Sequence, residues 1–152
     1  MSNLLSSLFG GGTGTAATIG SGDVGVNVQI DVNETAHGFS VGNVLRYSGS
    51  GLVLAQADSA SGSEADGVVI TVTDANNFVF CLFGQASVGA ITDDDSNGLT
   101  AGTAYYVSET TAGGFTPIQP VGVSNYVKPI FKVTDVASVI IVNPQLSIQG
   151  TP

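Results

Sequence analysis

The chain repeats part of itself after about sixty residues, and this internal repeat restricts its fold more than any other feature. The segment GFSVGNVLRYS (residues 38–48) aligns with GLTAGTAYYVS (98–108), and ITVTDANNFVF (70–80) aligns with FKVTDVASVII (131–141). The two alignments occur in the same order, with offsets of 60 and 61 residues. The matched residues are mainly glycines, hydroxyl side chains and an aspartate, which are typical of turns. The repeat therefore predicts two copies of one strand-and-turn unit.

Each copy combines short segments of β-branched residues with glycine-containing turns. The predicted strands are 43–48, 52–57, 67–73 and 77–83 in the first copy, and 103–108, 115–119, 127–134 and 138–142 in the second. A further strand, VGVNVQIDV (24–32), alternates valine or isoleucine with other residues, which predicts one buried face. Two similar halves bury their apolar faces most easily against each other. We therefore expect an all-β fold, a β-sandwich or flattened barrel built from pseudo-repeats 37–83 and 97–143 and preceded by an extended N-terminal arm.

The charge balance excludes several classes of partner. The net charge is −9, with only three basic residues against twelve acidic ones. Three basic side chains cannot neutralise the phosphate backbone of a nucleic acid. We therefore expect no nucleic-acid binding. An anionic membrane would repel the chain, and no segment approaches the roughly 18 apolar residues of a membrane-spanning helix. The N-terminus also lacks the basic residues and the long apolar run of a secretory signal.

The N-terminal residues 1–22 differ from the rest of the chain. Leu4, Leu5, Leu8 and Phe9 have the spacing of one face of a short helix, and a Gly- and Thr-rich linker follows them. One reading is an anchor peptide whose apolar side chains bind a partner while the linker acts as a tether. The other reading is a frayed tail. Residues 23–152 are expected to form a single all-β domain.

The sequence shows no recognisable set of catalytic residues, which predicts that the protein is not an enzyme. His37 precedes a glycine and is expected to be a turn or capping residue, and Cys81, within FVFCLF, is expected to be a small buried hydrophobic residue. No serine lies in a G-x-S-x-G motif. The glycine-rich segment at residues 10–22 lacks the G-K-[ST] ending of a phosphate-binding loop.

One acidic turn is the best candidate for a metal site. Asp93, Asp95 and Asn97, followed by Gly98, match the first half of a calcium-binding loop, but the position of the final glutamate is occupied by Ala104. The alternative is a solvated acidic turn between two strands. A weak structural calcium site is therefore the one cofactor that the sequence suggests.

A group of aromatic residues could form a patch that binds sugar. The candidates are Tyr47, Tyr105, Tyr106, Phe115 and Tyr126. Aromatic side chains on strands pack more often in a core or a subunit contact, and this is the alternative for all five.

The segment GLTAGTAYYVSETTAGGFT, with KPIFKVTDVASVIIVNP after it, resembles a pattern found in bacteriophage virion proteins. The earlier segment AHGFSVGNVLRYSGSGLVLAQADSASGSEADGVV is similar to the matching upstream part of such proteins, so the resemblance covers about residues 36–143. It implies a β-rich structural module without enzymatic activity, usually trimeric, of a kind found in tail fibres, baseplates and small capsid-decorating proteins.

The resemblance and the residues together favour a virion accessory protein, assembled in the host cytoplasm. The first hypothesis is a capsid decoration or cement protein, a homotrimer whose N-terminal arm binds the major capsid protein or another virion protein. The second is a tail tip or short tail-fibre component that contacts glycans on the host surface. A calcium-dependent sugar-binding module or a hydrolase fragment is the third.

Overall fold

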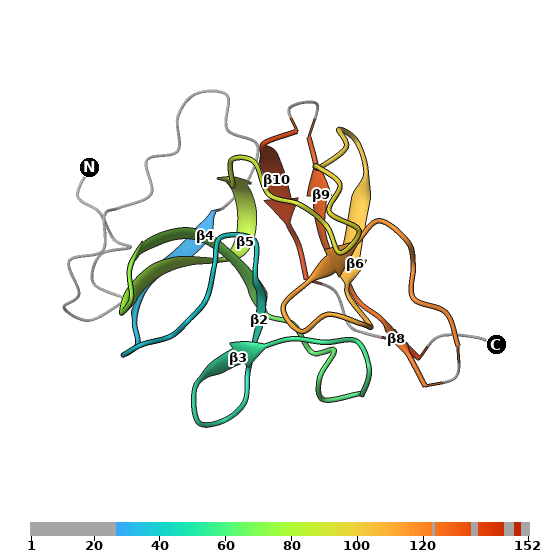
Figure 1. The fold of residues 1–152 in the computed structure, drawn as a ribbon, viewed down its shortest axis with the longest axis horizontal. Helices are drawn as coiled ribbons and strands as arrows, with labels where there is room; N and C mark the ends of the chain where they lie inside the picture. Colours follow the sequence, from blue (N-terminus) through green and yellow to red (C-terminus); the bar gives the residue numbers. More distant parts are fainter. Residues whose placement is uncertain (1–26, 123, 135–136, 145–147, 150–152) are drawn as a thin grey trace, which may run out of the picture.

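The computed structural model describes residues 27–122, 124–134, 137–144 and 148–149 (Figure 1). All the regular secondary-structure elements in these ranges are β-strands, so the predicted all-β class is confirmed. The strands are β1 (Val28–Asn33), β2 (Val44–Tyr47), β3 (Leu52–Leu54), β4 (Gly67–Asp74), β5 (Asn77–Ser87), β6 (Ala104–Val107), β7 (Phe115–Thr116), β8 (Tyr126–Val127), β9 (Pro129–Val133), β10 (Val139–Val142) and β11 (Ile148–Gln149). The predicted N-terminal arm, including Leu4, Leu5, Leu8 and Phe9, lies outside the described residues.

Nine strands form one antiparallel sheet with the order β3-β2-β4-β5-β10-β9-β6-β7, and β1 pairs with β5. The two remaining strands, β8 and β11, pair with each other. Read from its outer ends, the sheet has the order β3-β2-β4-β5 in the first half and β7-β6-β9-β10 in the second. Figure 1 shows the halves as two lobes, with β4 and β5 in one and β10, β9 and β6 in the other. The sheet curls into a half-barrel, not a sandwich of two separate sheets.

The long strand β5 joins the two halves. Its first part pairs with β4 and β1, and its last four residues, Gly84–Ser87, pair with β10. Backbone hydrogen bonds also connect the far ends of the curled sheet. The Val44 N–H donates to the Gly113 carbonyl (2.9 Å), and the Gly113 N–H donates to the Ala55 carbonyl (2.7 Å). These bonds hold loops of the second half against the β2–β3 hairpin of the first, so the half-barrel encloses its core.

The main core lies inside the curl and draws on both halves. Val44, Val68 and Cys81 contribute from the first half, and Tyr105 and Ile140 from the second. All five are at most 1% exposed. Since neither half encloses these side chains alone, the two halves depend on each other for burial.

A smaller second core covers the other face of the first half. It consists of Leu45, Leu52, Val69, Phe78 and Phe80. Strands β2, β4 and β5 are therefore buried on both faces there, which explains the continuous apolar runs in their sequences. In β10, by contrast, burial alternates along the strand, because its outer face has no such cover.

The two halves share a strand order but differ in register. Val44 of β2 pairs with Val68, whereas Ala104 of β6 pairs with Lys132. The offsets of the sequence alignment would place residue 129 opposite Ala104. At Ala104 the shift is three residues, and a β-bulge between Tyr105 and Tyr106 changes it beyond that point, where Tyr106 pairs with Pro129. Before the bulge the odd shift moves the side chains of the strand to the opposite face, because successive residues point to opposite sides. Accordingly Val44 lies in the core and Ala104 is exposed.

The prediction of a buried face for the first strand is wrong for most of β1. Val28 and Ile30 are 38% and 42% exposed, and only Val32 is half-buried, where it packs against the smaller core. The physical reason is position: β1 pairs only with β5 among the described strands, and nothing described covers its ends. The alternation of apolar residues does not reveal that the strand lies at an edge.

The predicted turn that opens each copy is confirmed in both places. Gly42 and Gly102 have φ angles of 93° and 76°, in the left-handed region that favours glycine. The Gly42 N–H donates to the carbonyl of Val69 (2.8 Å), and the Gly102 N–H donates to that of Thr134 (3.0 Å). Both glycines thus attach a turn to the adjacent long strand of their own half.

Candidate functional site

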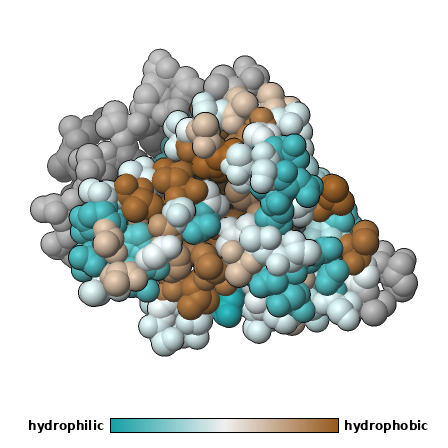
Figure 2. Space-filling model, viewed as in Figure 1, coloured by the Kyte–Doolittle hydropathy of each residue, from teal (hydrophilic) through white to brown (hydrophobic). Residues whose placement is uncertain are grey.

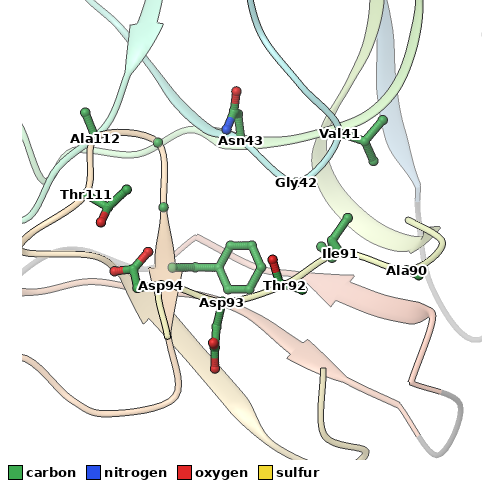
Figure 3. A pocket seen from close by; sticks show the side chains of 13 residues that line it. Val41, Gly42, Asn43, Ala90, Ile91, Thr92, Asp93, Asp94, Thr111 and Ala112 are labelled. Carbon is green, nitrogen blue, oxygen red and sulfur yellow. The ribbon is translucent and has the colours of Figure 1, made fainter. Parts of the chain in front are cut away.

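Three turns meet around an open pocket of about 450 Å³ (Figure 3). They are residues 41–43, before β2, residues 90–94, after β5, and residues 111–115, which lead into β7. The first turn belongs to the first half of the sheet and the last to the second half. The pocket exists because the curl brings these distant turns together.

Asp93 organises the turn below the pocket. Its Oδ1 accepts hydrogen bonds from the backbone N–H groups of Asp95 (3.1 Å) and Asn97 (2.8 Å). Its own N–H donates to the Asn97 carbonyl (2.9 Å), and the side chain is 7% exposed. In Figure 3 the carboxylate points away from Asn43. Asp93 is therefore first of all a turn-forming side chain, which satisfies two amides that would otherwise lack partners.

The three predicted calcium ligands thus lie in one tight turn. Asp95 and Asn97 are exposed, and one carboxylate oxygen of Asp93 is already occupied by amides. Within the described residues, no group of three or more His, Cys, Asp or Glu side chains could hold a metal ion. The geometry favours the acidic-turn reading, and calcium binding remains a prediction for experiment.

Asp94 is the chemically distinctive residue of the pocket. Burial raises the pKa of its carboxyl group above the ordinary value, a side-chain hydrogen bond with Ser108 opposes this, and the neighbouring charges of Asp93 and Asp95 raise it further. The Asp94 N–H donates to the Phe115 carbonyl (3.1 Å). A Cβ atom at Gly114 would collide with Asp94 Oδ1, so this glycine makes room for the carboxylate.

The remaining lining residues limit the chemistry of the pocket. They are Val41, Gly42, Asn43, Ala90, Ile91, Thr92, Thr111, Ala112, Gly113 and Phe115. Asp93 and Asp94 are the only ionisable side chains among all the lining residues. The Asn43 side chain is already engaged, since its Oδ1 accepts the Ser40 N–H (2.8 Å). The lining offers hydrogen-bonding groups and one perturbed carboxyl, but no nucleophile paired with a base.

His37 lies elsewhere and performs the turn role expected from the sequence. Its Nδ1 accepts the Phe39 N–H (2.9 Å), so its Nε2 carries the proton and donates to the Asp74 carbonyl (3.0 Å). The ring also contacts the rings of Phe39 and Phe78, with centroids 5.4 and 4.7 Å away. Both ring nitrogens are used by the backbone, which confirms the structural interpretation.

Cys81 is fully buried in the main core, as expected for a small hydrophobic residue. Burial raises the pKa of its thiol to about 11, and its Sγ lies 3.7 Å from the Phe83 carbonyl. Since the thiolate is the reactive form, this side chain is chemically inert near neutral pH.

The predicted aromatic patch for sugar does not form, because its central members lie in the core. Tyr105 and Phe115 are 1% and 3% exposed, and the ring of Tyr105 stacks on that of Phe131 (5.2 Å between centroids). The Tyr105 hydroxyl accepts the Thr100 N–H (3.0 Å). Tyr47 is 69% exposed. The alternative of core packing is thus confirmed for Tyr105 and Phe115.

The sequence did not single out Asn43, Thr111 or Gly114 as pocket residues. Their turn chemistry is visible in the sequence, but their proximity depends on the curl of the sheet.

Comparison with protein-family models, with curated proteins and with solved structures finds no match to this chain. A membrane-spanning helix is also not found in the described part of the chain.

Proposed function

We propose that the protein is a non-enzymatic structural protein of a bacteriophage virion, which decorates and cements the capsid as a homotrimer. The resemblance of about residues 36–143 to phage virion proteins motivates the proposal. The all-β body, whose two halves are tied together by backbone hydrogen bonds, is the structural observation that supports it most directly.

A cement protein has to bear load without opening. In this chain the two outer ends of the sheet are connected at several points. Besides the bonds of Gly113, the Ala57 N–H donates to the Ser108 carbonyl (2.7 Å), and the Tyr126 N–H donates to the Ala57 carbonyl (3.0 Å). Pulling the halves apart would break these bonds and expose the shared core at the same time. Such a body suits a static structural role.

In the proposed mechanism, Leu4, Leu5, Leu8 and Phe9 of the N-terminal arm bind an apolar groove between neighbouring major capsid subunits. Each large apolar side chain contributes roughly 1.5–3 kcal/mol when it is fully buried. In a trimer three arms act together, which raises the overall affinity through effective concentration. The net charge of −9 keeps the protein from the packaged DNA.

We also propose that the body arose from two copies of one unit, pseudo-repeats 37–83 and 97–143. The shared strand order and the matching turns at Gly42 and Gly102 support a duplication. The difference in register would then be a later change that moved the outer face of the second half into solvent.

The function is tested by locating the protein on particles and by altering the arm. Gold-conjugated antibody against residues 23–152 should label the phage head, and label confined to the tail would favour the tail-tip or short-fibre alternative.

A variant with Leu4, Leu5, Leu8 and Phe9 changed to serine should fail to bind particles that lack the protein. The matched control, Ser6→Ala with Ser7→Ala in the same segment, should bind normally. Binding of the serine variant at wild-type strength would contradict the arm mechanism.

A further inference from the structure

Asn97 and Gly98 form the only Asn–Gly pair of the chain, and both residues are exposed in the acidic turn. Asparagine before glycine is chemically labile, because the glycine nitrogen can attack the side-chain carbonyl carbon where no Cβ atom shields it. A Cβ atom added at Gly98 would meet no atom within 4 Å, so the space beside this amide is open. Exposure alone does not select Asn97, since Figure 2 shows several separate hydrophilic areas on one face of the molecule.

The backbone amide of Gly98 is directed away from the hydrogen bonds of the turn. Thr92 and Gly98 form an isolated antiparallel bridge. The hydrogen bond of this bridge joins their neighbours, from the Asp93 N–H to the Asn97 carbonyl (2.9 Å). In such a non-hydrogen-bonded pair the two residues direct their own N–H groups away from each other. The Gly98 nitrogen therefore points outward, where it can act as a nucleophile.

The other asparagines in the described part of the chain lack this combination. Asn143 precedes Pro144, which has no backbone N–H. Asn97 makes its hydrogen bonds to Asp93 through its backbone, and within the described ranges no hydrogen bond to its side-chain amide is found. Six other asparagines hold hydrogen bonds through their side chains, namely Asn27, Asn33, Asn43, Asn76, Asn77 and Asn125.

We propose that Asn97 is a site of spontaneous deamidation in the folded protein. The Gly98 nitrogen forms a bond with Cγ of Asn97, and the bond from Cγ to the side-chain nitrogen breaks. Ammonia leaves with the proton of the Gly98 amide. A water molecule then opens the resulting cyclic imide at either of its carbonyl groups and leaves aspartate or isoaspartate at position 97. Water is the only co-reactant, and the inference does not depend on the proposed virion role.

Asp93 restrains this reaction through the backbone of Asn97. Its Oδ1 accepts the Asn97 N–H (2.8 Å), and its own N–H donates to the Asn97 carbonyl (2.9 Å). Ring closure requires rotation about the bond between Cα and the carbonyl carbon of Asn97, which moves this carbonyl. The two hydrogen bonds therefore slow ring closure without covering the side-chain amide. The product adds a negative charge beside Asp93 and Asp95, and isoaspartate also lengthens the backbone inside the turn.

The only Asp–Gly pair of the chain, Asp66–Gly67, provides an internal comparison, because it can form the same cyclic imide. Oδ2 of Asp66 accepts the Tyr47 N–H (2.7 Å), and Gly67 is buried at the start of β4. A Cβ atom at Gly67 would collide with the Cys81 carbonyl, whereas the space at Gly98 is open. In the folded protein Asp66 should therefore not form isoaspartate.

The test is incubation of the folded full chain at mildly alkaline pH, followed by peptide mapping and enzymatic methylation of isoaspartate. A chelator is included so that calcium cannot hold the Asn97 side chain. Conversion at Asn97 should precede conversion at every other asparagine. Gly98→Ala should slow it roughly fivefold or more, because the methyl group restricts the backbone and shields the nitrogen. Asp93→Ala should accelerate it roughly two- to tenfold, as expected for the loss of its hydrogen bonds.

The matched control for Asp93→Ala is Asp95→Ala, which removes a neighbouring negative charge and keeps both hydrogen bonds of Asp93. It should convert at close to the wild-type rate. In urea, the wild type and Asp93→Ala should convert equally, because the turn is no longer formed. Melting temperatures establish which variants are folded, and Gly98→Ala keeps the test decisive if Asp93→Ala is not. The proposal is overturned if Asn97 keeps its amide in the folded protein, if another asparagine converts first, or if Gly98→Ala converts as fast as the wild type. Equal rates for folded Asp93→Ala and Asp95→Ala would overturn the role of Asp93.

Discussion

Asp74 and Asp94 are both carboxylates in turns, and their surroundings move their pKa values in opposite directions. At Asp94 the largest cause is burial, which disfavours the charged form and raises the pKa. At Asp74 the largest cause is the hydrogen bond from the Asn76 N–H (2.8 Å), followed by that from the Asn77 side chain, and both lower the pKa. The two residues therefore contribute to stability with opposite dependence on pH.

Asp94→Asn should stabilise the protein at neutral pH. The folded state binds a proton at Asp94 more tightly than the unfolded state does, so the ionised carboxylate is destabilising above its folded pKa. As the pH falls through the folded pKa toward 3.8, the wild type becomes protonated and loses this disadvantage. Thermal melting of both proteins across this range should show a higher melting temperature for the variant at pH 7 and a shrinking difference in acid. A difference that is constant with pH would contradict the role of burial.

Asp74→Ala should have the opposite behaviour. The lowered pKa means that ionised Asp74 stabilises the folded state above its unfolded pKa and that this contribution is lost as the pH falls through the folded pKa. The variant should melt below the wild type at neutral pH and approach it in acid. Asp58→Ala, in another turn, serves as the control for a general effect of removing negative charge.

At the scale of single elements, β10 shows how alternation along a strand separates two environments. Ile140 is fully buried and the adjacent Ile141 is 44% exposed on the outer face. Ile140→Ala should lower the free energy of unfolding by about 2–5 kcal/mol, because it leaves a cavity in the main core. Ile141→Ala should cost less than about 1 kcal/mol in the monomer, since the site is near the surface. Urea unfolding at low protein concentration measures both, and equal losses would show that the register of β10 is wrong.

A second element, β4, begins with a glycine that packs against β5. A Cβ atom at Gly67 would collide with the backbone carbonyl of Cys81. Gly67→Ala should therefore destabilise the fold by about 1–3 kcal/mol, as overpacking does. Gly98→Ala is the control, because no atom lies within 4 Å of its added Cβ and its φ is not in the left-handed region. A neutral effect at Gly67 would mean that the two strands can separate without cost.

At the scale of the whole molecule, the shared core predicts that the two halves unfold together. The Val69 N–H donates to the Asn43 carbonyl in the first half, and the Val133 N–H donates to the Thr103 carbonyl in the second, both at 2.9 Å. Ile130→Val removes one buried methyl from the core at a cost of about 1 kcal/mol, which corresponds to roughly fivefold faster exchange through global unfolding. Native-state hydrogen exchange should show this acceleration at both amides. Acceleration at Val133 alone would identify the halves as separate units.

The whole-molecule view also shows which properties follow from the sequence and which needed the tertiary structure. The sequence alone predicted the β class, the glycine turns at Gly42 and Gly102, and the structural roles of His37 and Cys81, because residue type and immediate sequence context indicate each of them, although their hydrogen-bond and packing partners come from distant segments. The exposed edge at β1 and the pocket around Asp94 depend on which distant segments meet. So does the face that Ala104 presents, since a shift of register by an odd number of residues reverses it without changing the apolar pattern. Only packing of the two halves around one core selects among such registers, and it thereby decided which half covers its outer side and which leaves Ile141 in water.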